Sequence, residues 1–161
     1  MRRVVRLALV PAGWLLLAAP AGAPIAPLTV CQTLRNLASL QGTNAAVVGR
    51  YSFRATGRWI GEQACDPPSA VPSQIWLDED LATGPKPDGP MELDATALKR
   101  AFADIQKRTS LGAFKFGSKD YDRWAVVYGR VEALPGDNGA SARPTLVFRG
   151  SGTLFFISPD D

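Results

Sequence analysis

Apolar and polar residues alternate between Ala45 and Arg54, and this period of two is typical of a half-buried β-strand. One face of the strand would carry Val47, Tyr51 and Phe53, and the other would carry Val48, Arg50, Ser52 and Arg54. Residues 55–57 have the composition of a turn, after which Arg58 to Cys65 forms a second strand. The two segments therefore predict a β-hairpin.

Three further strands are predicted downstream. Gln74 to Asp78 forms a short third strand, and Arg123 to Leu134 forms a fourth. After a long loop, Thr145 to Ser158 forms the last strand, and the glycines at positions 150 and 152 predict a bulge or bend in it.

A short helix is predicted ahead of the strands. Thr29 and Gln32 have the spacing of a capping box at the start of residues 29–41, and Gly42 is suited to end the helix.

A second helix is predicted over residues 94–109, with Asp94 as its N-cap. Its apolar stripe consists of Leu98, Ala101, Phe102 and Ile105. The preceding segment, residues 79–92, is rich in proline, glycine and charge, and these residues favour a loop.

The order of these elements, a helix followed by β-β-β-α-β-β, resembles an OB-fold, a five-stranded, partly open barrel with a helix between strands three and four. The resemblance covers Ala45 to Ser158, with Gly49 and Gly129 placed where barrel strands curve. It implies a mainly β chain with two helices. It also implies that a ligand would bind on the face of strands two and three and on the adjoining loops.

Residues 121–132 read Tyr-Asp-Arg-Trp-Ala-Val-Val-Tyr-Gly-Arg-Val-Glu. Through this segment, the chain is similar to a family of uncharacterised exported bacterial proteins. The resemblance implies export and supplies no mechanism.

The N-terminal residues predict a cleaved export signal, residues 1–21. Arg2, Arg3 and Arg6 precede an uncharged run that is shorter than the roughly 20 apolar residues a membrane-spanning helix requires. Small residues follow this run, so we expect cleavage near Ala21, within about three residues. The remaining chain would be a single domain without a transmembrane anchor, periplasmic or extracellular.

Cleavage would change the charge of the chain. The precursor carries 18 basic and 15 acidic residues, and three of the basic ones lie in the predicted signal. The mature domain, residues 22–161, would carry 15 of each and be neutral. A nucleic acid is therefore not favoured as a partner, because such partners are bound through an excess of cations.

Histidine is absent from the chain. This absence excludes histidine as a metal ligand, a general base or a member of a catalytic triad. Cys31 and Cys65 are the only cysteines, and in an oxidising compartment we expect them to form a structural disulfide. The alternatives are a free nucleophilic thiol or a soft metal site, but the chain has no CxxC motif to support them. No metal site and no cofactor are predicted.

The OB resemblance places one candidate binding face on strands two and three. Its residues are Arg54, Arg58, Trp59, Gln74, Trp76 and Asp78. An indole beside polar groups is suited to stack on a base or a sugar ring. The alternative is that the N-terminal helix, tied through Cys31 to Cys65, covers Trp76.

A second candidate is a patch in which cations and aromatic residues alternate, made of Lys107, Arg108, Lys115, Phe116, Lys119 and Tyr121. Such a patch is suited to hold phosphate or a polyanion. The alternative is structural, since cations are common at the C-terminus of a helix and aromatic side chains in a linker pack it against the barrel.

No catalytic residue is predicted. The carboxylates at residues 78–80 and those of Glu62, Asp120 and Asp122 have no recognised catalytic or EF-hand spacing. The first hypothesis is therefore a non-catalytic binding module for a protein, an envelope polymer or a small ligand. The second is an accessory envelope protein without a small-molecule site, and the third is a carboxylate-dependent hydrolase.

Overall fold

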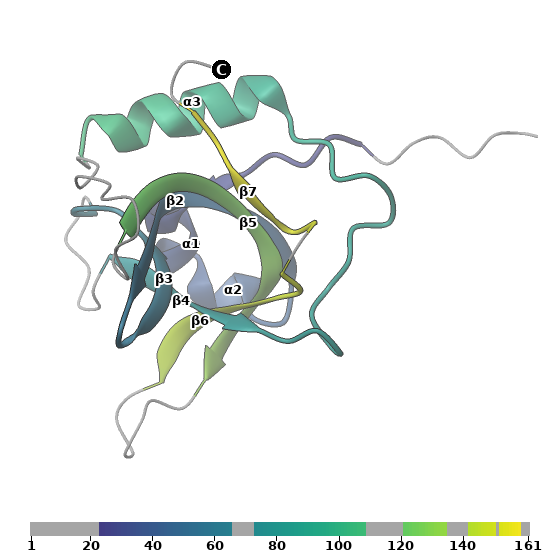
Figure 1. The fold of residues 1–161 in the computed structure, drawn as a ribbon. Helices are drawn as coiled ribbons and strands as arrows, with labels where there is room; N and C mark the ends of the chain where they lie inside the picture. Colours follow the sequence, from purple (N-terminus) through teal and green to yellow (C-terminus); the bar gives the residue numbers. More distant parts are fainter. Residues whose placement is uncertain (1–22, 66–72, 109–120, 135–141, 151, 159–161) are drawn as a thin grey trace, which may run out of the picture.

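The structure of the protein, a computed structural model, describes residues 23–65, 73–108, 121–134, 142–150 and 152–158. Its elements in chain order are β1 (Leu28–Thr29), α1 (Val30–Arg35), α2 (Leu37–Leu40), β2 (Asn44–Arg54), β3 (Gly57–Gly61), β4 (Gln74–Glu79), α3 (Ala95–Gln106), β5 (Tyr121–Leu134), β6 (Arg143–Phe148) and β7 (Leu154–Phe156) (Figure 1). The predicted export signal and its cleavage point at Ala21 lie outside the described residues.

Five strands form a barrel in the order β2-β3-β4-β6-β5, and β5 pairs back onto β2. Neighbouring strands run antiparallel, except for the parallel pair β4 and β6. The chain is thus mainly β with an OB-like barrel, as predicted. The barrel is closed rather than partly open, because β2 and β5 pair continuously from Asn44↔Arg130 to Phe53↔Tyr121.

The barrel interior is filled by alternate residues of every strand. The buried members are Ala45, Val47, Tyr51, Ile60, Ile75, Leu77, Ala125, Val127, Val131, Leu146 and Phe148. Val47 and Tyr51, predicted to share one face of the strand, both belong to this interior cluster, whereas Phe53 of the same predicted face is exposed. Val48 belongs to a second cluster on the outside of the barrel. This separation follows from the period of two in a strand.

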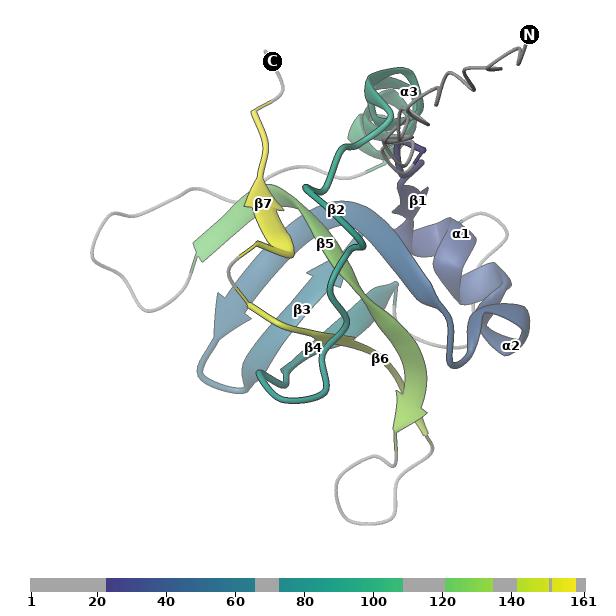
Figure 2. The same ribbon diagram turned by 90° about the vertical axis from the view of Figure 1, so that its right-hand side faces the viewer.

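The short helices α1 and α2 close one end of the barrel (Figure 2). Val30 is completely buried in the interior cluster, and Leu34, Leu37 and Leu40 pack against that cluster. The capping box at Thr29 and Gln32 is confirmed. The predicted single helix is divided at Asn36, whose side-chain amide donates to Gln32 O at 2.9 Å. Such a local side-chain bond competes with the helical backbone pattern.

Helix α3 packs on the outer surface of the barrel, across β2 and β5 (Figure 1). The Asp94 carboxylate accepts hydrogen bonds from Thr96 N and Ala97 N, which confirms the predicted N-cap. Phe102 contacts Trp124 edge to face, with ring centroids 4.9 Å apart. The other buried members of this cluster are Ala46, Val48, Ala101, Ile105 and Val126.

Two strand predictions differ from the structure, and one strand was not predicted. The second strand ends at Gly61 rather than Cys65, and the short strand β1 was not predicted. The last strand is two strands, β6 and β7, because Gly150 and Gly152 take positive φ values of 86° and 89° that most residues disfavour. Within the part of the chain that the structure describes, no helix is long and apolar enough to cross a membrane.

Candidate binding face

The outer surface of the barrel has two unlike halves. The part on β2 and β5, which we call the covered face, lies beneath α3. It consists of Ala46, Val48, Trp124 and Val126. The part on β3, β4 and the start of β6, which we call the open face, consists of Trp59, Gln74, Trp76, Asp78 and Arg143. Further along β6 the outward residues Thr145 and Val147 are buried. The five side chains of the open face alternate with the inward residues of the same strands, and none of them is fully buried.

Two indoles lie side by side on the open face. Trp59 and Trp76 are directly opposite each other in the β3–β4 ladder, with ring centroids 5.5 Å apart and planes tilted by 58°. The ring of Trp76 lies against Gly57, where an added Cβ would come within 2.8 Å of Trp76 Cζ3. A glycine is required at this position because Trp76 needs the space and because the backbone has a φ of 131°.

Arg143 adds a cation to this aromatic pair. Its guanidinium carbon lies 4.6 Å from the centroid of Trp76, within the range of a cation–π contact. Arg143 reaches Trp76 because β6 runs parallel to β4, with Thr145 opposite Trp76. Sequence reasoning missed Arg143, since nothing local in the chain indicates that strands so far apart are neighbours.

Gln74 and Asp78 flank Trp76 on the same strand. Each is two residues from the indole and therefore points to the same side of β4. Gln74 is half-buried and Asp78 is exposed. Four of the six predicted binding residues, Trp59, Gln74, Trp76 and Asp78, are therefore brought together.

The other two predicted residues, Arg54 and Arg58, have acidic partners elsewhere. Arg54 Nη2 lies 2.8 Å from Asp122 Oδ1, and that oxygen also accepts a hydrogen bond from Ser52 at 2.6 Å. Arg58 Nη1 lies 3.0 Å from Glu79 Oε2, and its guanidinium lies over Phe148. These contacts direct both cations away from the two indoles.

The N-terminal helix packs on the inward side chains, whereas Trp76 points outward. The apolar residues of α1 and α2 contact the interior cluster, which includes the two β4 neighbours of Trp76, Ile75 and Leu77. Trp76 itself is half-buried, and among the described residues it contacts Gly57, Trp59 and Arg143. The interior packing of the helix accounts for its apolar side without Trp76.

The predicted basic and aromatic patch is only partly within the described residues. Arg108 is directed to Glu62, and Lys107 forms an exposed pair with Asp104 at 3.9 Å. Tyr121 begins β5 and pairs with Phe53 through its backbone. Lys115, Phe116 and Lys119 lie outside the described residues.

The predicted disulfide between Cys31 and Cys65 is present, with Cα atoms 5.3 Å apart. Beside it, the fully buried Glu62 side chain connects two helices. Its Oε1 accepts a hydrogen bond from Cys31 N at 2.9 Å, and its Oε2 accepts from Arg108 Nη2 at 3.0 Å. Glu62 therefore has a structural role. Its carboxylate accepts from a backbone N–H at the start of α1 and balances the charge of Arg108, which follows α3.

The three consecutive carboxylates at residues 78–80 diverge. Asp78 is exposed on the open face, Glu79 pairs with Arg58, and Asp80 closes the turn that follows β4. The hydrogen bond from the Thr83 hydroxyl, with those from Thr83 N and Ala82 N, lowers the pKa of Asp80 below its ordinary value. In the described ranges no group of three metal-ligating side chains is found.

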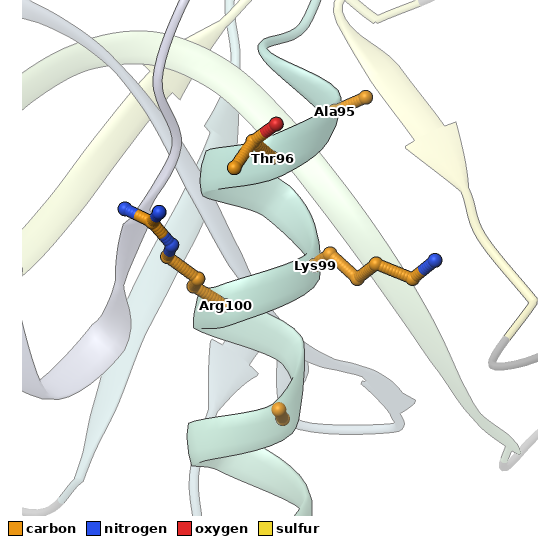
Figure 3. A pocket seen from close by; sticks show the side chains of 5 residues that line it. Ala95, Thr96, Lys99 and Arg100 are labelled. Carbon is orange, nitrogen blue, oxygen red and sulfur yellow. The ribbon is translucent and has the colours of Figure 1, made fainter.

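A hollow lies on the outer surface of α3, lined by Ala95, Thr96, Lys99, Arg100 and Ala103 (Figure 3). The side chains of Lys99 and Arg100 extend in different directions from the helix. Because these two side chains do not converge on a common point, the hollow is a weaker candidate for a binding site than the open face.

No protein-family model matches the chain, and no match is found among curated proteins or among solved structures.

Proposed function

We propose that the protein is an exported, non-catalytic binding module that recognises its ligand on the open face. The observation that carries this proposal is the pair of half-buried indoles, Trp59 and Trp76, on the half of the barrel that α3 leaves uncovered. Aromatic side chains on a protein surface supply a large contact area at low entropic cost, and they are enriched where proteins bind other molecules.

Export is supported by two features. The chain begins with a basic segment followed by a short uncharged run, and Cys31 and Cys65 form a disulfide of the kind that persists in oxidising compartments. The chain's likeness to exported bacterial proteins, carried by residues 121–132, belongs to the same proposal. N-terminal sequencing of the exported protein is expected to begin near Gly22, within about three residues.

The carboxylate environments favour binding over hydrolysis. Glu62 and Asp122 are each held by an arginine, and the pKa of Asp80 is lowered rather than raised. A general acid at neutral pH requires a raised pKa. These three carboxylates therefore fit structural roles.

The test is binding of the purified protein to isolated envelope material. Wild type is compared with Trp59→Ala, and Phe156→Ala serves as a matched control because Phe156 is 41% exposed on β7, away from the open face. We expect Trp59→Ala to lose binding and Phe156→Ala to keep it. Equal retention by wild type and both variants would favour an accessory protein that does not use this face.

A further inference from the structure

We propose that the ligand of the open face is a neutral, hydroxyl-rich glycan chain, whose sugar rings pack on Trp59 and hydrogen-bond to Gln74 and Asp78. This inference rests on the proposed function and names the chemical class of the ligand. Charge, ring geometry and the polar groups beside the rings support it.

On the open face and its border with β5, the described side chains include equal numbers of cations and carboxylates. Arg143 lies over Trp76, Asp78 is exposed, and at the border on β5 Arg130 Nε pairs with Glu132 Oε1 at 2.5 Å. Two cations thus accompany two carboxylates. A polyanion is held by an excess of cations, and an exposed carboxylate beside the aromatic pair would repel phosphate groups. A neutral ligand does not require an excess of cations, and the exposed carboxylate does not repel it.

The ring geometry also disfavours a run of nucleobases. Successive bases stack on parallel aromatic planes, whereas the planes of Trp59 and Trp76 are tilted by 58°. Trp76 already contacts Gly57 and Arg143. Trp59 is therefore the principal platform, and Trp76 supports it from the side. A single sugar ring, with C–H groups on its faces and hydroxyls on its rim, fits one amphipathic indole of this kind.

The polar groups are placed for the rim of such a ring. Gln74 and Asp78 lie on either side of Trp76, each about 7 Å along the strand from it. The amide both donates and accepts, and the carboxylate accepts two or more hydrogen bonds, so together they match hydroxyl groups, which also do both. The face extends from Trp59 on β3 across β4 to Arg143 at the start of β6, and this width suits a chain rather than an isolated monomer.

The experiment measures binding of the purified protein to immobilised neutral hexose and N-acetylhexosamine oligomers, with heparin and oligo(dT) beside them. We expect at least one neutral oligomer to bind, insensitively to salt. Trp59→Ala is expected to weaken that binding at least about tenfold, which corresponds to roughly 1.4 kcal/mol. Asp78→Asn tests the hydrogen bond, and Asp88→Asn, at an exposed loop carboxylate, is its matched control.

The outcomes separate this inference from the proposed function. Binding to neutral oligomers that Trp59→Ala removes and Asp88→Asn preserves supports both. Salt-sensitive binding to heparin or oligo(dT) alone, reduced by Trp59→Ala, overturns the glycan class and keeps the open face as a binding site. If wild type binds none of the probes, the glycan inference is overturned. Envelope binding by wild type that Trp59→Ala removes would then still support the proposed function. Circular dichroism of each variant identifies any loss of folding.

Discussion

The covered face and the open face of the barrel each present an outward tryptophan in a different environment. Trp124 lies beneath α3 with only 4% of its surface exposed, and Phe102 packs against it. Trp76, on the opposite half, is half-buried and lies against Trp59 and Arg143. The same residue type on the same side of the barrel wall is core in one place and surface in the other.

The neighbours of each tryptophan explain the difference. Ala46, Val48 and Val126 surround Trp124 with apolar surface, and burying that surface under an amphipathic helix is favourable. Gln74, Asp78 and Arg143 surround Trp76, and covering them with an apolar helix face would leave polar groups without partners. An outer face with polar groups between its aromatic side chains is therefore better left open to solvent or to a polar ligand.

The largest expected difference between the two faces is in stability. Trp124→Ala is expected to lower the free energy of unfolding by about 3–5 kcal/mol, because it leaves a cavity beneath α3. Trp59→Ala is expected to lower it by about 1 kcal/mol, since it removes mainly one aromatic contact. Urea unfolding monitored by circular dichroism measures both. Equal losses would show that the open face is as tightly packed as the covered face.

The disulfide links α1, which closes the barrel end, to the chain after β3. Replacing both Cys31 and Cys65 with alanine is expected to lower the free energy of unfolding by about 3–4 kcal/mol, from the loop-closure entropy of the unfolded chain. Reduction of the wild type should reproduce this loss in urea. Mass analysis under non-reducing conditions checks the bond itself, and two free thiols there would contradict it.

Glu62 joins the barrel to both helical regions, and the open face has no equivalent connection among the described side chains. Glu62→Gln is expected to cost about 2 kcal/mol, because the buried charge that accepts from Arg108 is lost. Asp104→Asn is the matched control at an exposed ion pair on α3, with an expected cost under about 0.5 kcal/mol. Denaturant midpoints compare the two. A similar cost for both would show that burial does not strengthen the Glu62 contacts.

The smallest expected effect concerns the turn that follows β4 at the border of the open face. Because the pKa of Asp80 is lowered in the folded protein, its hydrogen bonds contribute stability above the pKa of the unfolded chain. This contribution is lost as the pH falls through the folded pKa. In an NMR pH titration, we expect the amide signals of Ala82 and Thr83 to change with a midpoint below pH 3.8, the ordinary pKa of an aspartate. Thr83→Val should move that transition upward, and an unchanged midpoint would contradict the assignment.

Local patterns predicted most of the elements. The alternation in β2 placed Val47 and Tyr51 on one face, and Asp94 marked the start of α3 to within one residue. Thr29 and Gln32 identified the start of α1. The division of the first helix at Asn36 was not predicted, since it depends on a local side-chain hydrogen bond. A bend at Gly150 and Gly152 was predicted, but not that it divides the last strand into two. Within the candidate site, Trp59, Gln74, Trp76 and Asp78 were identified, and Arg143 was not.

The amino-acid sequence by itself determined the properties that depend on residue type and on short spacing along the chain. These are the absence of histidine, the cysteine pair, the period of each strand and the caps of the helices. The choice of which tryptophan is buried and which is left on the open face came only with the tertiary structure. That choice depends on which strands become neighbours and which half of the barrel α3 covers, and both result from packing between residues far apart in the chain.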